Sequence, residues 1–354
     1  MKHHRGDANE SHGVFGAGVD GQLAHLLGQA VGTRLAAGRL VVGGDGQPGS
    51  GALQEALVSG ALRTGCTVYD VGTVPTPALY FAKDRLWADG AAMVTGANRP
   101  QGNSRFALSL GKLPATELEL AELEQAVEEG GPFAAGKGRL LNSDIIEPYR
   151  SFLVAHFVPA QPLPVMVGGL SGSPVGAAQE TLRVLDYDVL ECPSPLGSEP
   201  ASGSVAESLV QAMCRGVPQQ RACLGMLCGD NGSRALLVDE TGTVLTPQQA
   251  LVLLARALLR YEPGSGVIYD ERLGSAVADE VRKVGGEPIA VRSGSPGVRR
   301  LLLERGAVLG ADAEGRYCFR TMGAEDALYA TLVMLRIASR LGGALRPSLA
   351  RLDL

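Results

Sequence analysis

The chain has 354 residues, 45% hydrophobic and 19% charged, which is typical of a folded protein of two or three domains. A net charge of −5 gives no electrostatic reason to expect nucleic acid or an anionic membrane as a partner. No apolar stretch is long enough to span a membrane, and the polar residues 1–13 predict a disordered tail. Six cysteines without a C-x-x-C pair predict buried, reduced thiols in a cytoplasmic protein.

Short apolar runs alternate with amphipathic segments along the chain, which is typical of α/β layers. The expected strands cover residues 40–46, 67–72, 90–94, 163–169, 188–191, 224–228, 235–239, 266–270, 288–291 and 307–310. The expected helices cover residues 23–35, 52–64, 117–129, 145–157, 176–185, 247–260, 276–284, 297–305 and 325–341, and another helix opens at Pro75-Thr76-Pro77. Thr116 is the expected N-cap of the helix at 117–129.

The alternation divides into three units of similar architecture. After the tail at 1–13, we predict domains at 14–142, 143–241 and 242–354. Each domain is expected to contain a mixed sheet layered by helices. A segment rich in Ser, Pro and Gly at 193–203 is predicted to be a long loop within the second domain.

Several segments resemble motifs of the α-D-phosphohexomutases, the phosphomannomutase/phosphoglucomutase family. Residues 70–77 resemble its DVG-x-VPTP segment, 42–46 its VGRDGR turn, and 242–247 the entry to its third domain. Residues 95–100 resemble its phosphoserine loop, Thr-Gly-Ser-His-Asn-Pro. The order and spacing imply three consecutive phosphohexomutase-type domains. The implied activity is an isomerase reaction, intramolecular phosphoryl transfer on hexose phosphates.

The residues at the phosphoserine loop depart from the family pattern. The loop here consists of Thr95, Gly96, Ala97, Asn98 and Arg99, with Ala97 at the position of the phosphorylated serine. Alanine has no oxygen and cannot carry a phosphoryl group, so we predict no catalytic residue here. A phosphate cradle made by Arg99 and Arg105 beside Ser104 is an open alternative, although solvated loop cations are the favoured interpretation.

The family's magnesium loop, D-G-D-G-D-R, has also changed. Its three aspartate positions match Gly229, Asn231 and Ser233, while Arg234 keeps the arginine. Asp230 lies one residue out of phase and is predicted to be a turn residue. Because Mg²⁺ prefers carboxylate oxygens, we expect no metal ion and no Mg²⁺ cofactor, although the resemblance implies one.

Charged residues remain at the positions that bind sugar and phosphate in the family. In its sugar loop, G-E-x-S-G-H, Asp312 replaces Glu, Glu314 replaces Ser and Arg316 replaces His. Arg292 stands at the lysine of its Lys-Thr-Gly-His loop. These four residues and Arg99 are the candidate substrate contacts. The two arginines of the VGRDGR turn are absent, since Gly44 and Gln47 occupy their positions.

The turns of the family are retained, whereas the residues that carry its chemistry are altered. This pattern predicts a catalytically inactive phosphohexomutase-like protein with a binding, regulatory or scaffolding role in carbohydrate metabolism. An active mutase, another enzyme of the pathway or a second copy of the chain is the expected partner. A divergent active phosphohexomutase and a phosphosugar sensor remain as alternatives. The family's fourth domain is expected to be missing, which would leave apolar surface near the helix at 325–341 for self-association.

Overall fold

The computed structural model describes residues 14–15, 20–96, 104–157, 161, 163–169, 172–192, 203–229, 231–292 and 294–354. The chain forms two compact units, Met1–Tyr149 and Arg150–Leu354. The described strands form three sheets, all of which contain parallel and antiparallel pairs. This confirms the predicted α/β class with mixed sheets. No helix in these ranges combines the length and the apolar character that a bilayer span requires.

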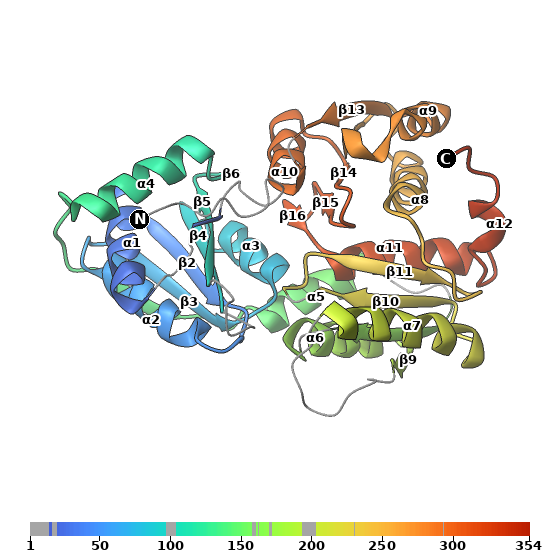
Figure 1. Ribbon diagram of the computed structural model, residues 1–354, viewed down its shortest axis with the longest axis horizontal. Coiled ribbons are helices and arrows are strands. Elements are labelled where there is room, and N and C mark those ends of the chain that lie inside the picture. Colours follow the sequence, from blue (N-terminus) through green and yellow to red (C-terminus); the bar gives the residue numbers. More distant parts are fainter. Residues whose placement is uncertain are drawn as a thin grey trace. The chain divides into compact units, whose positions relative to one another are not determined.

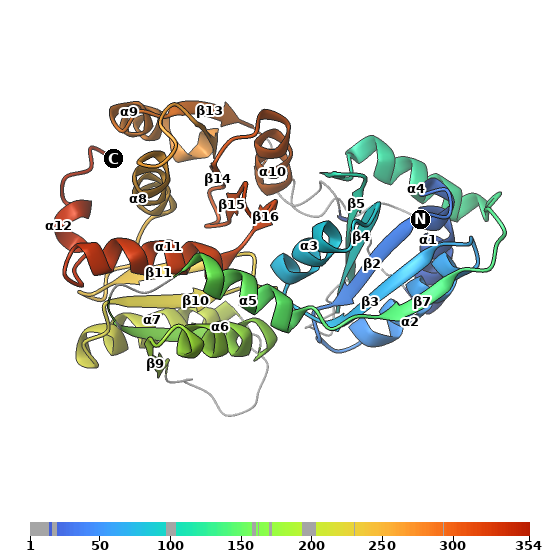
Figure 2. The same ribbon diagram turned by 180° about the vertical axis from the view of Figure 1, so that it is seen from behind.

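The first unit contains a seven-stranded sheet in the order β1-β5-β4-β2-β3-β7, with β6 paired to β5 (Figure 1). β4, β2, β3 and β7 run parallel to one another, and β5 is antiparallel to β4. Figure 2 shows β7 at the edge of this sheet, beside β3. The strands are β1 (Val14–Phe15), β2 (Arg39–Gly44), β3 (Thr67–Thr73), β4 (Gly90–Thr95), β5 (Arg105–Leu110), β6 (Leu113–Pro114) and β7 (Arg139–Asn142).

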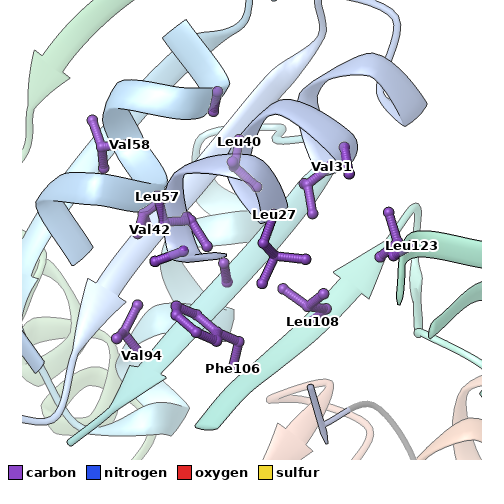
Figure 3. Packing of buried hydrophobic residues seen from close by; sticks show 14 of the residues in the cluster. Leu27, Val31, Leu40, Val42, Leu57, Val58, Val94, Phe106, Leu108 and Leu123 are labelled. Carbon is purple, nitrogen blue, oxygen red and sulfur yellow. The ribbon is translucent and has the colours of Figure 1, made fainter. Parts of the chain in front are cut away.

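Helices α1 (Gly21–Arg34), α2 (Ser50–Leu62) and α4 (Glu117–Glu129) share one hydrophobic core with this sheet, and α3 (Thr76–Arg85) also contacts β2 and β4. The core exists because alternate strand residues point to the same face. Figure 3 shows Leu40 and Val42 of β2 beside Leu27 of α1, with Phe106 and Leu108 of β5 nearby. Phe106 has no solvent exposure. This packing holds the β4–β5 hairpin in place.

The second unit contains a four-stranded sheet in the order β11-β10-β8-β9 and a five-stranded sheet in the order β13-β12-β14-β15-β16. The first comprises β8 (Pro164–Gly169), β9 (Asp188–Glu191), β10 (Leu224–Cys228) and β11 (Ala235–Asp239). The second comprises β12 (Gly266–Asp270), β13 (Glu287–Val291), β14 (Leu309–Ala311), β15 (Tyr317–Phe319) and β16 (Ala324–Glu325). Both place their parallel strands first along the chain and add the antiparallel ones afterwards.

Helix α5 (Ile146–His156) crosses the boundary between the two units in sequence. The helices that follow are α6 (Gly172–Val184), α7 (Gly203–Gln219), α8 (Pro247–Leu259), α9 (Ser275–Lys283), α10 (Gly294–Arg305), α11 (Ala327–Arg340) and α12 (Arg346–Leu349), with a 3₁₀ turn, η1 (Glu271–Leu273). α11 packs on β10 and β11 of the four-stranded sheet and on α8, which in turn contacts β14 of the five-stranded sheet.

One long helix, α7, was not predicted from the sequence. Its buried residues Leu209, Met213 and Val217 recur every four positions, which is a helical signal. Pro218 lies in its last turn, and the predicted loop at 193–203 ends where this helix begins, at Gly203. α6 also begins at Gly172, four residues before the predicted start. Strands β1, β5, β6, β7, β15 and β16 were not predicted.

The start of α4 agrees with the expected N-cap. Thr116 Oγ1 accepts a hydrogen bond from the Glu119 amide at 3.1 Å, and the Glu119 carboxylate accepts one from the Thr116 amide at 2.8 Å. This reciprocal pair is a capping box. Partial burial alone would raise the pKa of Glu119, but the bonds from Thr116 and the charge of Arg34 outweigh it and lower that pKa.

Replacing Thr116 by alanine is expected to lower the free energy of unfolding by about 1 kcal/mol at neutral pH. The substitution leaves a helix amide without its acceptor. Urea unfolding measures the loss, and Thr116→Ser, which keeps the oxygen, is the matched control. Equal stability of the alanine and serine variants would contradict the assignment.

Candidate functional site

The loop that resembles the phosphoserine loop connects β4 and β5. Thr95 pairs with Arg105 as the last rung of this antiparallel ladder, so the expected loop residue Arg105 in fact begins a strand. Gly96 follows Thr95 at the base of the hairpin loop. Ala97, Asn98 and Arg99 lie outside the described residues. The structure therefore places the start of this loop and leaves the role predicted for Arg99 untested.

The base of this loop is anchored by a buried carboxylate. Asp45, only 3% exposed, accepts hydrogen bonds from the Gly96 amide at 3.2 Å and the Gln47 amide at 3.0 Å through the same oxygen. Burial raises the pKa of Asp45 above its ordinary value despite these bonds. A Cβ atom at Gly96 would lie 2.5 Å from the Pro48 carbonyl oxygen, so only glycine fits this close approach. The backbone at the start of the loop is therefore held in place by the bond from Gly96 to Asp45 and by the close approach to Pro48.

The space beside Gly44 is filled by a neighbouring side chain. A Cβ atom at Gly44 would lie 2.5 Å from Oε1 of Gln54, which is 7% exposed. Nε2 of Gln54 donates to Asp70 at 2.7 Å, which fixes the amide in that position. A longer side chain at Gly44, such as the arginine of the family motif, would have to break this bond.

The turn that resembles the magnesium loop connects β10 and β11. The Gly229 amide donates to the Arg234 carbonyl at 2.9 Å and closes the turn. Oδ1 of Asn231 accepts from the Ser233 amide at 3.1 Å and from its hydroxyl at 2.7 Å. Ser233 is only 6% exposed. Asp230 lies outside the described residues.

The described side chains of the β10–β11 turn are not suitable ligands for Mg²⁺. Of the described residues in the turn, none carries a carboxylate, and the Asn231 oxygen is already used by Ser233. A hard divalent cation prefers several charged oxygens in octahedral geometry. Across the described ranges, no group of three His, Cys, Asp or Glu residues is arranged to hold a metal ion.

The turn that resembles the sugar loop connects β14 and β15. Asp312 has no solvent exposure. Its Oδ1 accepts from the Glu314 amide at 3.0 Å and the Arg316 amide at 2.9 Å, and its Oδ2 accepts from Nη1 of Arg316 at 2.9 Å. Burial raises the pKa of Asp312 to about 6, against the attraction of Arg316. The carboxylate predicted to meet a sugar hydroxyl is engaged within its own turn.

The other charges of this turn are paired as well. Glu314 accepts from Nη1 of Arg272 at 2.7 Å and from its Nη2 at 3.3 Å. Arg272 was not among the predicted site residues, although its place two residues beyond the carboxyl end of β12 was a signal. Arg292 lies apart from this network, bonded to Glu271 at 3.1 Å with its side chain 88% exposed. Arg316 also lies 3.6 Å from Glu314.

The β10–β11 and β14–β15 turns contact each other, although they were predicted in separate domains. Nε of Arg234 donates to the Glu314 carbonyl at 2.7 Å, and the Ala235 amide donates to the Gly315 carbonyl at 3.0 Å. Arg234, which keeps the arginine of the family motif, is thus bonded to the backbone of the β14–β15 turn. The second unit therefore brings together four of the predicted residues: Arg234, Asp312, Glu314 and Arg316.

Comparisons with known proteins agree with this architecture. Residues 4–131 match the family model "Phosphoglucomutase/phosphomannomutase, alpha/beta/alpha domain I" and residues 246–352 match its domain III. The phosphomannomutase/phosphoglucomutase of Pseudomonas aeruginosa is 27% identical over 342 residues, covering 94% of this chain and 73% of that protein. The phosphoglucomutase of Neisseria meningitidis is 26% identical over 345 residues, covering 94% and 74%.

A solved structure extends the likeness to the whole fold. The phosphoglucomutase/phosphomannomutase family protein of Burkholderia thailandensis superposes with a TM-score of 0.87 at 24% identity, covering 99% of this chain and 80% of that one. This similarity includes the segment between the two matched domains. The chain belongs to the phosphoglucomutase/phosphomannomutase family.

Proposed function

We propose that this protein keeps the phosphohexomutase fold but does not transfer phosphate, and that it acts in carbohydrate metabolism by binding a partner protein. One observation carries the proposal. In the turn that would contact a phosphosugar, Asp312, Glu314 and Arg316 are bonded to one another or to Arg272. Phosphoryl transfer depends on charges that are available to neutralise the moving phosphate, so pairing them internally removes what the chemistry needs.

The loops around that turn support the same conclusion. Ala97 offers no oxygen for a phosphoryl group, and the described donors of the β10–β11 turn do not fit Mg²⁺. Gln54 fills the space beside Gly44 where the family motif has an arginine. An active but divergent mutase is favoured by a different observation, the names of the relatives, which are mutases over nearly the whole length of this chain.

A turnover assay decides between the two functions. Purified protein is incubated with glucose 1-phosphate or mannose 1-phosphate, Mg²⁺ and a bisphosphate activator, and the 6-phosphate is measured. We expect no product above the protein-free blank, while the Pseudomonas aeruginosa relative serves as the positive control. Formation of the 6-phosphate would establish the active mutase and end this proposal.

The variant Ala97→Ser makes the assay more specific, because it restores only the hydroxyl oxygen of the family's phosphoserine position. It is expected to remain without turnover, since the other groups stay paired or absent. Calorimetry with hexose phosphates tests the sensor alternative separately. No heat at millimolar ligand would eliminate phosphosugar sensing and leave a protein partner as the object of binding.

The sequence predicts apolar surface near the last long helix, but α11 is buried along most of its length. The exposed apolar side chains near it are Leu341, 42% exposed, and Tyr261, 62% exposed, whose hydroxyl accepts from Arg340 at 2.6 Å. The α11 face therefore offers little to a second copy, and an active mutase or another enzyme of the pathway is the favoured partner.

A further inference from the structure

Strand β7 forms an edge of the first sheet, and its outer side has no partner among the described strands. The amides of Arg139 and Ser143 donate to carbonyl groups in or next to β3, at 3.1 and 2.9 Å. Because alternate residues of a parallel strand bond to the same neighbour, the amides of Leu140 and Asn142 point away from β3. This edge therefore presents backbone groups to which an extended chain can add.

An open groove of about 530 Å³ lies between this edge and helix α2. Val58 and Leu62 line it from α2, and Leu140 lines it from β7. Figure 2 shows β7 at the edge of the sheet with α2 beside it. Leu140 is 46% exposed although its side chain is large and apolar. An apolar side chain of a bound molecule would bury this surface, which favours binding.

The two ends of the groove differ in charge. Arg63 and Lys137 line the end where β7 begins, because the residue before Lys137 donates its amide to the Arg63 carbonyl at 2.8 Å. Neither cation forms an ion pair with another residue in the described ranges. Glu55 and Asp70 line the other end: Asp70 pairs in register with the last residue of β7, and Glu55 lies about 12 Å before Arg63 along α2.

We infer that this groove binds an extended segment of the partner protein, which adds to β7 as a further strand. The inference rests on the proposed function, because that function requires a partner, and it states the chemistry of the contact. In strand addition the backbone bonds give affinity and alternate side chains give specificity. The charges call for an acidic residue at Arg63 and Lys137, an apolar one against Leu140 and a basic one near Glu55. The edge from Lys137 to the end of β7 spans about 16 Å, which about six extended residues match.

The first test selects phage-displayed random decapeptides on the full-length protein. Retained peptides are synthesised with a fluorescent label, and their dissociation constants are measured by anisotropy. We expect peptides with an acidic residue at one end, an alternating apolar centre and a basic residue at the other end. Bound peptide is also expected to slow hydrogen exchange at the amides of Leu140 and Asn142, which contact through side chains alone would not do.

Two variants then test the backbone and the charge separately. Asn142→Pro removes an outward amide and leaves the bonds to β3 in place, and Asn142→Thr, which keeps the amide, is its control. Lys137→Glu reverses a charge of the groove, and Lys112→Glu, in the exposed turn between β5 and β6, is its control. We expect Asn142→Pro and Lys137→Glu to weaken peptide binding about tenfold or more, and both controls to bind like the parent. Replacing the acidic residue of the peptide by lysine is expected to restore binding to Lys137→Glu and to weaken binding to the parent.

Three outcomes would overturn the inference. They are a library that yields no groove-dependent peptide, peptide binding that Asn142→Pro and Lys137→Glu leave intact, and a parent dimer in sedimentation that Asn142→Pro dissociates. In the last case the groove holds a second copy of the chain. If Asn142→Pro does not fold by circular dichroism, Lys137→Glu and the charge-swapped peptide decide in its place. Turnover in the mutase assay bears on the proposed function alone, since peptide binding is measured without hexose phosphate.

Discussion

Replacing Asp312 by alanine is expected to lower the free energy of unfolding of the second unit by about 3–5 kcal/mol. The carboxylate is fully buried and accepts two backbone amides as well as Nη1 of Arg316. Its removal takes from the Arg316 side chain, only 20% exposed, its 2.9 Å ion pair with a fully buried carboxylate and takes from both amides their Asp312 acceptor. The loss is structural, so it is expected whether or not the protein binds a ligand.

The measurement uses slightly alkaline buffer, in which Asp312 is ionised because burial raises its pKa only to about 6. Hydrogen exchange under increasing urea, read on peptides of the second unit, isolates its transition from that of the first unit. Asp279→Ala is the control, since both partners of its ion pair with Arg282 are exposed, and it is expected to change stability by less than about 0.5 kcal/mol. Similar losses in the two variants would show that Asp312 does not organise its turn.

Replacing Phe106 by alanine is expected to lower the free energy of unfolding of the first unit by about 3–5 kcal/mol. Its ring is fully buried in the core that α1, α2 and α4 form with the sheet (Figure 3). The truncation removes apolar surface and leaves a cavity that the neighbours fill only partly. Phe106 pairs with Val94 in the β4–β5 hairpin, so the damage also reaches the loop that the hairpin carries.

Hydrogen exchange on peptides of the first unit measures its unfolding, because the chain's single tryptophan, Trp87, is already 77% exposed in the folded state. Leu118→Ala is the matched control, because Leu118 lies in the same unit but is 70% exposed. It is expected to change stability by less than about 0.5 kcal/mol. Phe106→Leu keeps part of the buried volume and should fall between the two. An alanine variant no less stable than the leucine variant would contradict the packing argument.

Local patterns were sufficient to predict most of the fold. The bounds of α4, β10, β11 and β12 agree with the prediction to the residue, and Thr116 caps α4 as expected. These elements carry strong local signals: a capping residue, an apolar run or a turn on either side. α7 was missed although its apolar spacing was available. The short strands β15 and β16 carry too few residues for any period to show.

The candidate site was predictable in its residues but not in their roles. Sequence alone placed Asp312, Glu314 and Arg316 on one turn and showed that Ala97 has replaced the nucleophile of the family motif. It could not show that Asp312 is buried, because burial depends on what packs over a turn. It also could not pair Arg272 with Glu314, which lies 42 residues further along the chain.

The sequence by itself determined which chemical groups the chain has. It showed the turns of the fold, the lack of a side-chain oxygen at Ala97 and the absence of aspartates from their expected positions in the β10–β11 turn. Only the tertiary structure decided which of the remaining charges are available. Folding brings Arg272, Asp270 and Glu314 to the same strand ends. Because these side chains have low solvent exposure, an unpaired charge there is costly, and each charge forms an ion pair with the nearest opposite charge. The sequence determines which side chains are charged. Which of them form ion pairs depends on their distances and burial, and these are set only when the strands assemble.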